Sequence, residues 1–394
     1  MATLQLATWA TNLTYASLPP GVLAAANKSF YNWAGCAIGG FASQPAPQIA
    51  LNTTLSQFSG PPTSSILGAN GLISLSYADA QTVALINGIA SHIDDYDDTH
   101  LETIIHPTGP VASALLAIAE AYGPVTGHDF ITAFTAGIEA ECKLGLAVSP
   151  EHYDIGWHIT STTGSIGAAV SVGKLLGLST THIQHAIGMQ EFFGSDTKAL
   201  HIGRAAQAGM LAALLARNGY TSSARPRGKL SNEIEARSLS VEHVKIVEIR
   251  VNPEVLALTG KTEPQSSLQA KFSIYHATAV ALLYGQATPD QFTNDVIGND
   301  TVVDMRRKVN VVMDNAVSRA EAYIKLTFDD ESALERHVEH VKGSIENPLT
   351  EAELESKFMG QVGLAIRRER SGDASRAFAS VIGMDDVGRV RGMY

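Results

Sequence analysis

Helical segments rich in small residues fill the first 228 residues and limit the possible folds most strongly. The clearest examples are TGSIGAAVSVGKLLGLS (163–179) and AAQAGMLAALLARNGY (205–220). Small side chains let neighbouring helices approach closely, so we expect both segments at the centre of a helical bundle. Residues 127–148 place apolar side chains at spacings of three and four, which predicts a further helix of that bundle. No glycine motif follows a strand in a phosphate-binding pattern, so these glycines are interpreted as packing positions.

The character of the chain changes near residue 225. The segment ARPRGKLSNEIEARSLS is charged and polar, and residues 241–253 then alternate, which places Val247, Ile249 and Val251 on one face of a strand. A helix at LQAKFSIYHATAVALLYG and a hairpin of RAEAYIKLTFDDES with HVEHVKGSIEN are expected to follow. We therefore predict a mainly α protein with a large all-helical domain (1–228), a smaller α+β domain (229–346) and C-terminal helices that return to the helical domain (347–394).

The composition limits which kinds of molecule the protein is expected to bind. A chain of 394 residues exceeds what one hydrophobic core usually serves, and the net charge of -11 argues against nucleic acid or an anionic membrane. Cys36 and Cys142, the only cysteines, lie in apolar helical stretches and are expected to be free thiols. We find no signal peptide and no apolar run of membrane-spanning length, so a cytoplasmic protein is expected.

A polar cluster between two apolar helical runs is the strongest candidate site. The stretch HIDDYDDTHLETIIHPTGP (92–110) places Asp95 and Thr99 at or just past the end of the first helix. His106 precedes Pro107, and a residue before proline is pushed out of the helical conformation. Pro107 suits the first turn of the next helix, whose N-terminus favours anionic groups. We expect an acidic residue, a hydroxyl and a histidine to converge there.

This stretch has two other interpretations, a solvated loop and a metal-binding motif. Acidic residues between helices are usually solvated, and a histidine before proline is often only a turn residue. The segment DDYDD also resembles the aspartate-rich motif that holds magnesium and a diphosphate in all-helical terpene synthases. That site needs a second metal-binding motif far downstream, and the sequence offers no convincing one.

Further candidates lie downstream. Trp157 and His158 stand just before a glycine-rich helix, and Lys198, His201 and Arg204 are three cations at a spacing of three ahead of an otherwise apolar helix. The alternatives are a satisfied core or capping histidine and a solvated basic face. Tyr275 and His276 are weaker candidates on the helix of the second domain. An acidic cluster, a lysine, an arginine and several histidines together suit proton chemistry on a multiply charged carboxylate.

The order of three motifs is recognisable. DDTHLETIIHP, then GWH, then TKALHIGRAAQAG, with a helical first half and an α+β second part, resembles the MmgE/PrpD family, which includes 2-methylcitrate dehydratases, cis-aconitate decarboxylases and iminodisuccinate epimerases. The resemblance covers nearly the whole chain. It implies a helical domain made from both chain ends, an inserted lid domain, an active site between the two, a homodimer, and no metal or organic cofactor.

The resemblance also assigns residues. Asp95 and Thr99 match the pocket residues of the acidic motif, His106 the histidine before proline, His158 the histidine of GWH, and Lys198 the lysine before the HIG turn. Tyr275 or His276 matches a lid tyrosine. One departure stands out: the family carries a catalytic lysine and histidine after the AAQAG helix, and residues 220–245 contain no pair of that kind. The lid domain of this chain is therefore expected to be shorter than that of the family.

Three hypotheses follow. The first is a cofactor-independent lyase, a dehydratase or decarboxylase, acting on a small polycarboxylate such as 2-methylcitrate or cis-aconitate. His106 would be its general acid or base, oriented by Asp95, while Lys198, Arg204 and His158 neutralise carboxylates and Thr99 bonds the substrate. The second is an epimerase or isomerase of a carboxylate, which needs only proton removal and return. The third is a non-catalytic relative, suggested by the missing lid pair.

Overall fold

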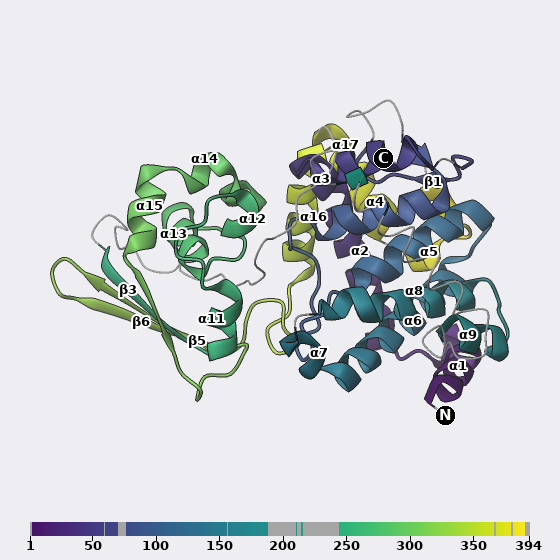
Figure 1. Ribbon diagram of the computed structural model, residues 1–394, viewed down its shortest axis with the longest axis horizontal. Helices are drawn as coiled ribbons and strands as arrows, with labels where there is room; N and C mark the ends of the chain where they lie inside the picture. The colour runs from purple at the N-terminus through teal and green to yellow at the C-terminus, as the bar shows by residue number, and fades with distance from the viewer. Residues whose placement is uncertain are drawn as a thin grey trace. The chain divides into compact units, whose positions relative to one another are not determined.

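The computed structural model divides the chain into two compact units, Met1–Thr221 with Glu351–Tyr394 (unit 1) and Ser222–Thr350 (unit 2). Unit 1 is built from helices, and unit 2 combines short helices with a four-stranded sheet (Figure 1). The predicted mainly α class with a smaller α+β domain is confirmed. The structure describes residues 2–58, 60–69, 76–155, 157–187, 210, 214–215, 244–365, 368–379 and 381–390.

The helices of unit 1 begin where the sequence supplies caps. Asp79 accepts hydrogen bonds from the backbone N–H groups of Gln81 and Thr82 and so caps α4, and Thr126 caps α6 in the same way. The described helices of this unit are α1 (Ala2–Asn12), α2 (Pro20–Ser43), α3 (Ala46–Leu55), α4 (Ala80–His92), α5 (Thr108–Tyr122), α6 (Gly127–Val148), α7 (Glu151–Asp154), α8 (Ile159–Leu175), α9 (Thr180–Ile187), α16 (Glu351–Ala365) and α17 (Arg368–Ala379). A short two-stranded sheet pairs β1 (Ser64–Ser65) with β2 (Tyr77–Ala78).

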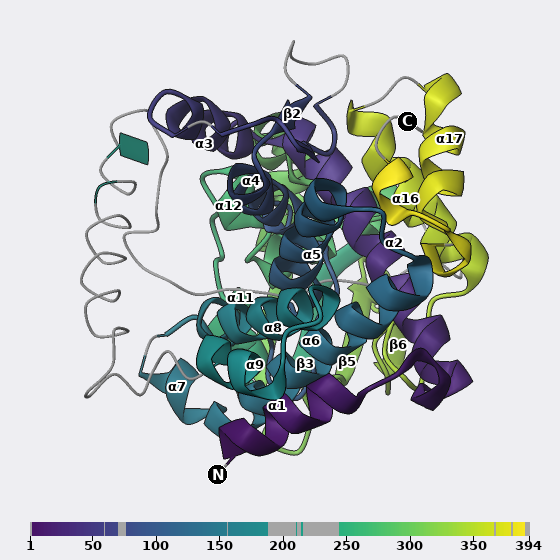
Figure 2. The ribbon, with the colours of Figure 1, turned by 90° about the vertical axis from the view of Figure 1, so that its right-hand side faces the viewer.

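Helix α2 runs through the core of unit 1. Phe30 and Trp33 are fully buried in its middle. The C-terminal helices α16 and α17 lie beside it (Figure 2). The ring of Tyr31 stacks on Phe358 of α16 with centroids 4.2 Å apart, and its hydroxyl lies 2.9 Å from Ser375 Oγ of α17. The two ends of the chain therefore share one core.

Glycines allow the closest helix contacts, as expected for the small-residue segments. A Cβ added to Gly137 on α6 would lie 2.7 Å from the backbone oxygen of Gly167 on α8. A Cβ on Gly40 of α2 would lie 2.0 Å from the backbone oxygen of Ala90 on α4. Neither position can hold a larger residue without moving a helix, so these glycines set how closely α2, α4, α6 and α8 pack.

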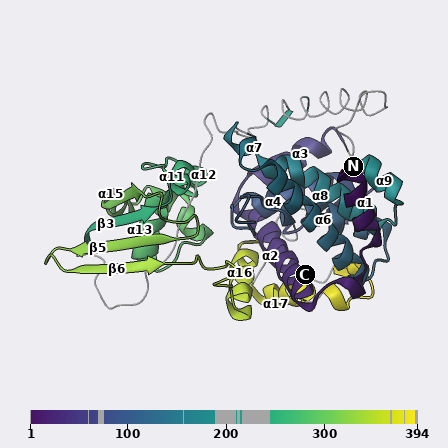
Figure 3. The same ribbon diagram turned by 90° about the horizontal axis from the view of Figure 1, so that it is seen from below.

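Unit 2 packs helices on one face of its sheet, which has the strand order β4-β3-β5-β6 (Figure 3). The predicted strand is β3, and Val247, Ile249 and Val251 are buried as expected. The elements are β3 (Val244–Val251), α11 (Pro253–Thr259), α12 (Ser267–Ala270), α13 (Ile274–Tyr284), α14 (Asn294–Ile297), α15 (Asp300–Arg307), β4 (Val309–Met313), β5 (Ala322–Phe328) and β6 (Ala333–Val338). Strand β4 pairs parallel to β3, and the other pairs are antiparallel.

Two local expectations needed correction. The expected single helix of unit 2 is divided into α12 and α13, because Ser273 adopts an extended conformation and caps α13 by accepting from the N–H of His276. The hairpin partner of β5 begins at Ala333, earlier than expected, because a tight turn follows Phe328 directly. Both cysteines are free. Among the described residues, no helix is both long and apolar enough to cross a membrane.

Candidate active site

The polar cluster occupies the connection between α4 and α5, as the sequence indicated. Helix α4 ends at His92, and Pro107 stands immediately before the first residue of α5. The connection folds back on itself, since the N–H of His100 donates to the carbonyl of Ile105 at 2.8 Å. It is tied to α5 by Thr108, whose hydroxyl donates to Asp98 Oδ2 at 2.6 Å. The sequence between two packed helices is thus held in one conformation.

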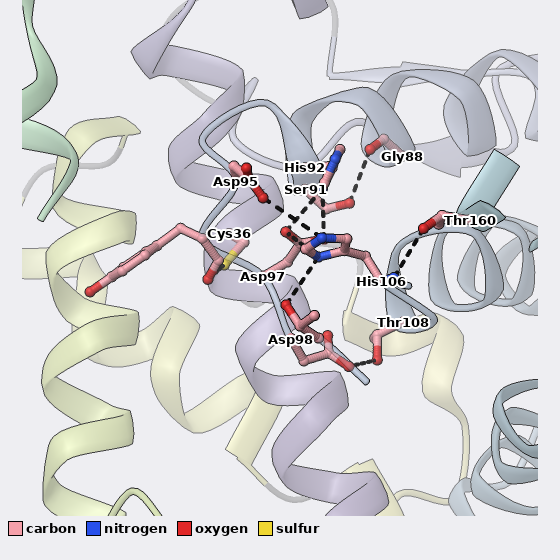
Figure 4. Close-up of polar contacts among 12 residues, drawn as sticks. Cys36, Gly88, Ser91, His92, Asp95, Asp97, Asp98, His106, Thr108 and Thr160 are labelled. Atoms are coloured by element: carbon pink, nitrogen blue, oxygen red, sulfur yellow. Dashed lines mark hydrogen bonds and ion pairs between the residues drawn. The ribbon is translucent and has the colours of Figure 1, made fainter. Parts of the chain in front are cut away.

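Asp97 stands at the centre of the cluster (Figure 4). Its side chain is fully buried, and its Oδ1 lies 3.0 Å from His92 Nδ1 and 3.3 Å from His106 Nδ1. Burial alone would raise the pKa of this carboxyl, but the two histidines and their hydrogen bonds hold the pKa of Asp97 well below its usual range. Asp97 is therefore ionised, and its negative charge lies against both rings.

His106 is the most enclosed histidine of the cluster, with 4% of its surface exposed. Its Nδ1 contacts Asp97 and lies 3.5 Å from Thr99 Oγ1, while its Nε2 lies 3.7 Å from Asp95 Oδ1. The backbone N–H of His106 donates to Thr160 Oγ1 on α8 at 3.1 Å. One ring nitrogen is thus anchored to a carboxylate, and the other faces a second carboxylate.

The backbone at Asp95 is unusual. Its φ of 50° lies in the left-handed region, where aspartate is more common than most non-glycine residues. This conformation reverses the chain directly after α4, with the N–H of Asp95 bonded to the carbonyl of His92 at 2.8 Å. Such backbone conformations gather at functional sites, because surrounding contacts must maintain them. The turn brings the side chain of Asp95 to His106.

Two carboxyl groups behind the cluster are held partly or wholly neutral. Burial raises the pKa of Asp98 to about 6, against the opposing effect of the Thr108 hydrogen bond. Burial raises the pKa of Glu141 on α6 to about 9, although Thr163 donates a hydrogen bond to it. Glu141 therefore carries its proton at neutral pH. The cluster has an ionised carboxylate in contact with histidines and a protonated one deeper in the helical core.

The structure brings together some of the predicted residues. Asp95, Thr99 and His106 converge as expected, and His158, the N-cap residue of α8, places its ring 6.1 Å from that of His92. Lys198, His201 and Arg204 lie outside the described residues. Tyr275 and His276 belong to unit 2. His276 is fully buried and bonds the carbonyl of Gln291 through Nε2 at 2.9 Å, so its ring serves the core of that unit.

Sequence reasoning missed His92 and Asp97. It chose Asp95 as the carboxylate that orients His106, whereas the closest carboxylate to that ring is Asp97. A signal was present: His92 and Asp97 lie five residues apart on either side of a helix end, where the chain must turn back. The sequence alone does not distinguish the four aspartates of DDYDD from one another. The left-handed turn at Asp95 determines which of them lie next to the histidine rings.

The cluster also has the donor set of a metal site. One ligand atom from each of His92, Asp95, Asp97 and His106 lies within 4.8 Å of all the others. Imidazole and carboxylate ligands suit several divalent metals. The same atoms pair with each other in a histidine–aspartate–histidine chain, which is equally suited to holding and moving a proton. The donor set fits either use.

Two family models and several curated relatives match this chain. The MmgE/PrpD N-terminal domain model matches residues 4–227, and the MmgE/PrpD C-terminal domain model matches residues 228–377. The cis-aconitate decarboxylase of Mus musculus is 25% identical over 358 residues, covering 73% of this chain and 72% of that protein. The human cis-aconitate decarboxylase is 39% identical over 150 residues, about a third of either chain (34% and 31%).

A longer match shows how this chain differs from a relative. The cis-aconitate decarboxylase-like protein oryM of Aspergillus oryzae is 23% identical over 450 residues, covering 93% of this chain and 92% of that protein. This chain has 394 residues, so at least 56 of those 450 aligned positions, the difference, have no counterpart in it. A shortened chain was expected from the missing lysine and histidine.

Proposed function

The chain belongs to the MmgE/PrpD family, and from this premise we propose that it is a cofactor-independent lyase acting on a small polycarboxylate, with cis-aconitate as the first candidate substrate. The observation that carries the proposal is the buried contact of Asp97 with both His92 and His106. The names of the relatives from mouse, human and Aspergillus favour decarboxylation over dehydration.

The reaction requires one proton at one carbon. Carbon dioxide leaves from the CH₂–COO⁻ arm of cis-aconitate, and the electron pair of the broken bond forms a new double bond to the central carbon. The original double bond moves its electron pair onto the far carbon, next to another carboxylate. That carbon takes up a proton, which gives 2-methylenesuccinate. An enzyme must therefore stabilise an enolate-like charge and deliver a proton beside it.

His106 is the proposed proton donor. The ionised Asp97 at Nδ1 stabilises the protonated ring, and Nε2 on the opposite side carries the transferable proton. Asp95, 3.7 Å from Nε2, holds that nitrogen in place, and Thr99 bonds the substrate or its water. His158 contributes a further polar group near His92. Lys198, which matches the lysine of the family motif, and Arg204, a nearby cation in the sequence, are proposed to neutralise the carboxylates.

Two other activities use the same groups. Dehydration of a 2-methylcitrate-like acid needs a base for the proton and an acid for the leaving hydroxyl, so His106 and its neighbours would serve there as well. Epimerisation needs only proton removal and return. The lack of a lysine–histidine pair in the family's pattern between residues 220 and 245 favours keeping this simpler reaction as the second candidate.

The test is turnover by the purified chain on a panel of cis-aconitate, 2-methylcitrate and iminodisuccinate. We expect release of carbon dioxide from cis-aconitate, and we expect His106→Ala to lower kcat at least ~100-fold while the far-UV circular dichroism stays unchanged. His185→Ala is the matched control, because His185 is an exposed histidine of α9. Near-normal turnover by His106→Ala would remove the assigned role. No turnover on any acid by the folded wild type would favour a non-catalytic relative.

A further inference from the structure

Unit 2 contains a small pocket of its own that the proposed reaction does not use. Its lining includes Thr262, Glu263, Tyr275, Arg306 and Arg307. The cavity volume is about 180 Å³, well below the ~300–1,000 Å³ of sites for whole drug-sized ligands. Two guanidinium groups against one carboxylate make the lining cationic. A pocket of this size and charge fits one small anionic group.

Arg306 supplies the buried positive charge of the pocket. It is 7% exposed, near the end of α15. Its Nη1 has two long contacts of 3.4 Å, to the carbonyl of Ile297 and to His276 Nδ1. Among the described residues, Arg306 forms no ion pair, and its hydrogen bonds are these two contacts of Nη1. Arginine is otherwise rarely buried without an anionic partner, because desolvating its charge is costly.

His276 fixes the direction of this guanidinium. Burial, together with the charge of Arg306, lowers the pKa of His276 to about 4 against the opposing effect of the Gln291 hydrogen bond, so the ring is neutral. Its Nε2 donates to the carbonyl of Gln291, which leaves the Nδ1 lone pair facing Arg306 Nη1. A neutral histidine in this tautomer accepts a hydrogen bond from the arginine. The other N–H groups of the guanidinium are then available to a ligand. The residue predicted to touch substrate is thus placed to orient Arg306.

We propose that Arg306 and Tyr275 form a carboxylate-binding site within unit 2, with His276 as its positioning residue. The planar guanidinium binds a carboxylate through two parallel N–H groups, a geometry that lysine cannot reproduce. Glu263, exposed in the same pocket, competes for the arginine through its own negative charge. The site takes a small carboxylic acid, and this inference stands independently of the reaction proposed above.

The test reads Arg306 directly in the full-length chain. Arginine Nε–H signals of ¹⁵N-labelled protein are recorded during titration with tricarballylate, a saturated tricarboxylate that lacks the double bond needed for the proposed decarboxylation. Arg306→Lys identifies the signal by removing it. We expect a saturable downfield shift of the Arg306 signal that sodium chloride at equal ionic strength does not produce. No shift, or the same shift with chloride, would overturn the proposal.

Variants separate binding from structure. The dissociation constant read from the Arg306 signal should rise at least tenfold in His276→Phe, where the orienting acceptor is lost, and should fall in Glu263→Gln, where the competing charge is removed. Arg250→Gln is the matched control, because Arg250 on β3 lies outside the pocket lining and pairs with Asp314 at 3.2 Å. Its affinity should stay within twofold of wild type. An unchanged dissociation constant in His276→Phe, or an equal loss in Arg250→Gln, would contradict the assignment.

Discussion

At the scale of single residues, the site depends on one buried carboxylate. Asp97 contacts two histidines through the same oxygen, and its side chain has no exposed surface. A buried charge without partners is strongly unfavourable, so the three groups stabilise each other only as a set. The arrangement places the negative charge of Asp97 against the rings where the proposed reaction needs a proton donor. Asp97 therefore couples the stability of the loop to its chemistry.

Asp97→Asn tests this coupling. The amide keeps the shape of the carboxylate but removes its charge, so we expect kcat to fall by about 100-fold or more and stability to fall by about 3–5 kcal/mol. Turnover and urea denaturation at pH 7 measure the two effects. Because the pKa of Asp97 in the folded state lies well below its usual value of 3.8, its stabilisation is present above that pH and is lost as the pH falls further.

The control is Asp154→Asn, which changes an exposed aspartate of α7. It should leave both turnover and the urea midpoint unchanged. An Asp97→Asn variant with wild-type turnover would show that Asp97 is only structural.

For Glu141 we predict a pH dependence of stability opposite in sign to that of Asp97. Its carboxyl is fully buried, and burial raises its pKa from the usual 4.5 to about 9 in the folded chain. The unfolded chain releases this proton from about pH 4.5 upward, while the folded chain keeps it until about pH 9. Stability contributed by this group is therefore complete below pH 4.5 and is lost progressively up to pH 9, by about 1.4 kcal/mol per pH unit.

Glu141→Gln should remove this dependence. We expect urea midpoints measured at pH 5.5 and 8.5 to differ less in the variant than in wild type. Glu139→Gln on the same helix is the matched control, since Glu139 is exposed and pairs with Lys143 at 2.7 Å. It should keep the wild-type pH dependence. Equal pH dependence in wild type and Glu141→Gln would mean that Glu141 is ionised in the folded chain.

At the scale of elements, the site rests on the approach of α2 to α4. Gly40 permits the backbone of α2 to touch Ala90, two residues before His92 ends α4. The loop is also fastened to α2, where Ser43 donates to Asp94 Oδ2 at 2.8 Å. The position of His92 therefore depends on a glycine in another helix.

Gly40→Ala should disturb this contact. Its Cβ would lie 2.0 Å from the Ala90 oxygen, and overpacking of this kind costs about 1–3 kcal/mol or more. We expect a lower melting temperature and reduced turnover, measured by calorimetry and by the decarboxylation assay. Gly21→Ala in the first turn of the same helix has nothing within 4 Å of the added carbon and should melt at or above the wild-type temperature. Equal melting of both variants would contradict this packing argument.

The sequence allowed the elements to be predicted better than their contacts. Periodicity identified the long helices and the buried face of β3, and Pro107 located the start of α5 next to His106. The break between α12 and α13 depends on Ser273 as a cap, which competes with an otherwise continuous apolar pattern. Helix α13 is apolar on all sides, so the pattern could not show that His276 faces the core. Long-range packing decided these features.

At the scale of the whole molecule, the family and the fold class are established, while the activity is proposed. The described residues supply a complete proton-handling cluster in unit 1 and an arginine pocket in unit 2. Lys198, which the resemblance places near the substrate, and the candidate cations His201 and Arg204 lie outside the described residues. The homodimer and the cytoplasmic location stay predictions. The central claim is that the cluster around His106 delivers a proton to a carbon next to a carboxylate.

Proton and carbon NMR of cis-aconitate incubated with the purified chain in deuterium oxide tests that claim most directly. The account predicts 2-methylenesuccinate carrying one deuterium on its saturated CH₂ carbon, together with carbon dioxide, and neither product with His106→Ala. Unchanged cis-aconitate without deuterium, from wild-type protein shown to be folded, would contradict it.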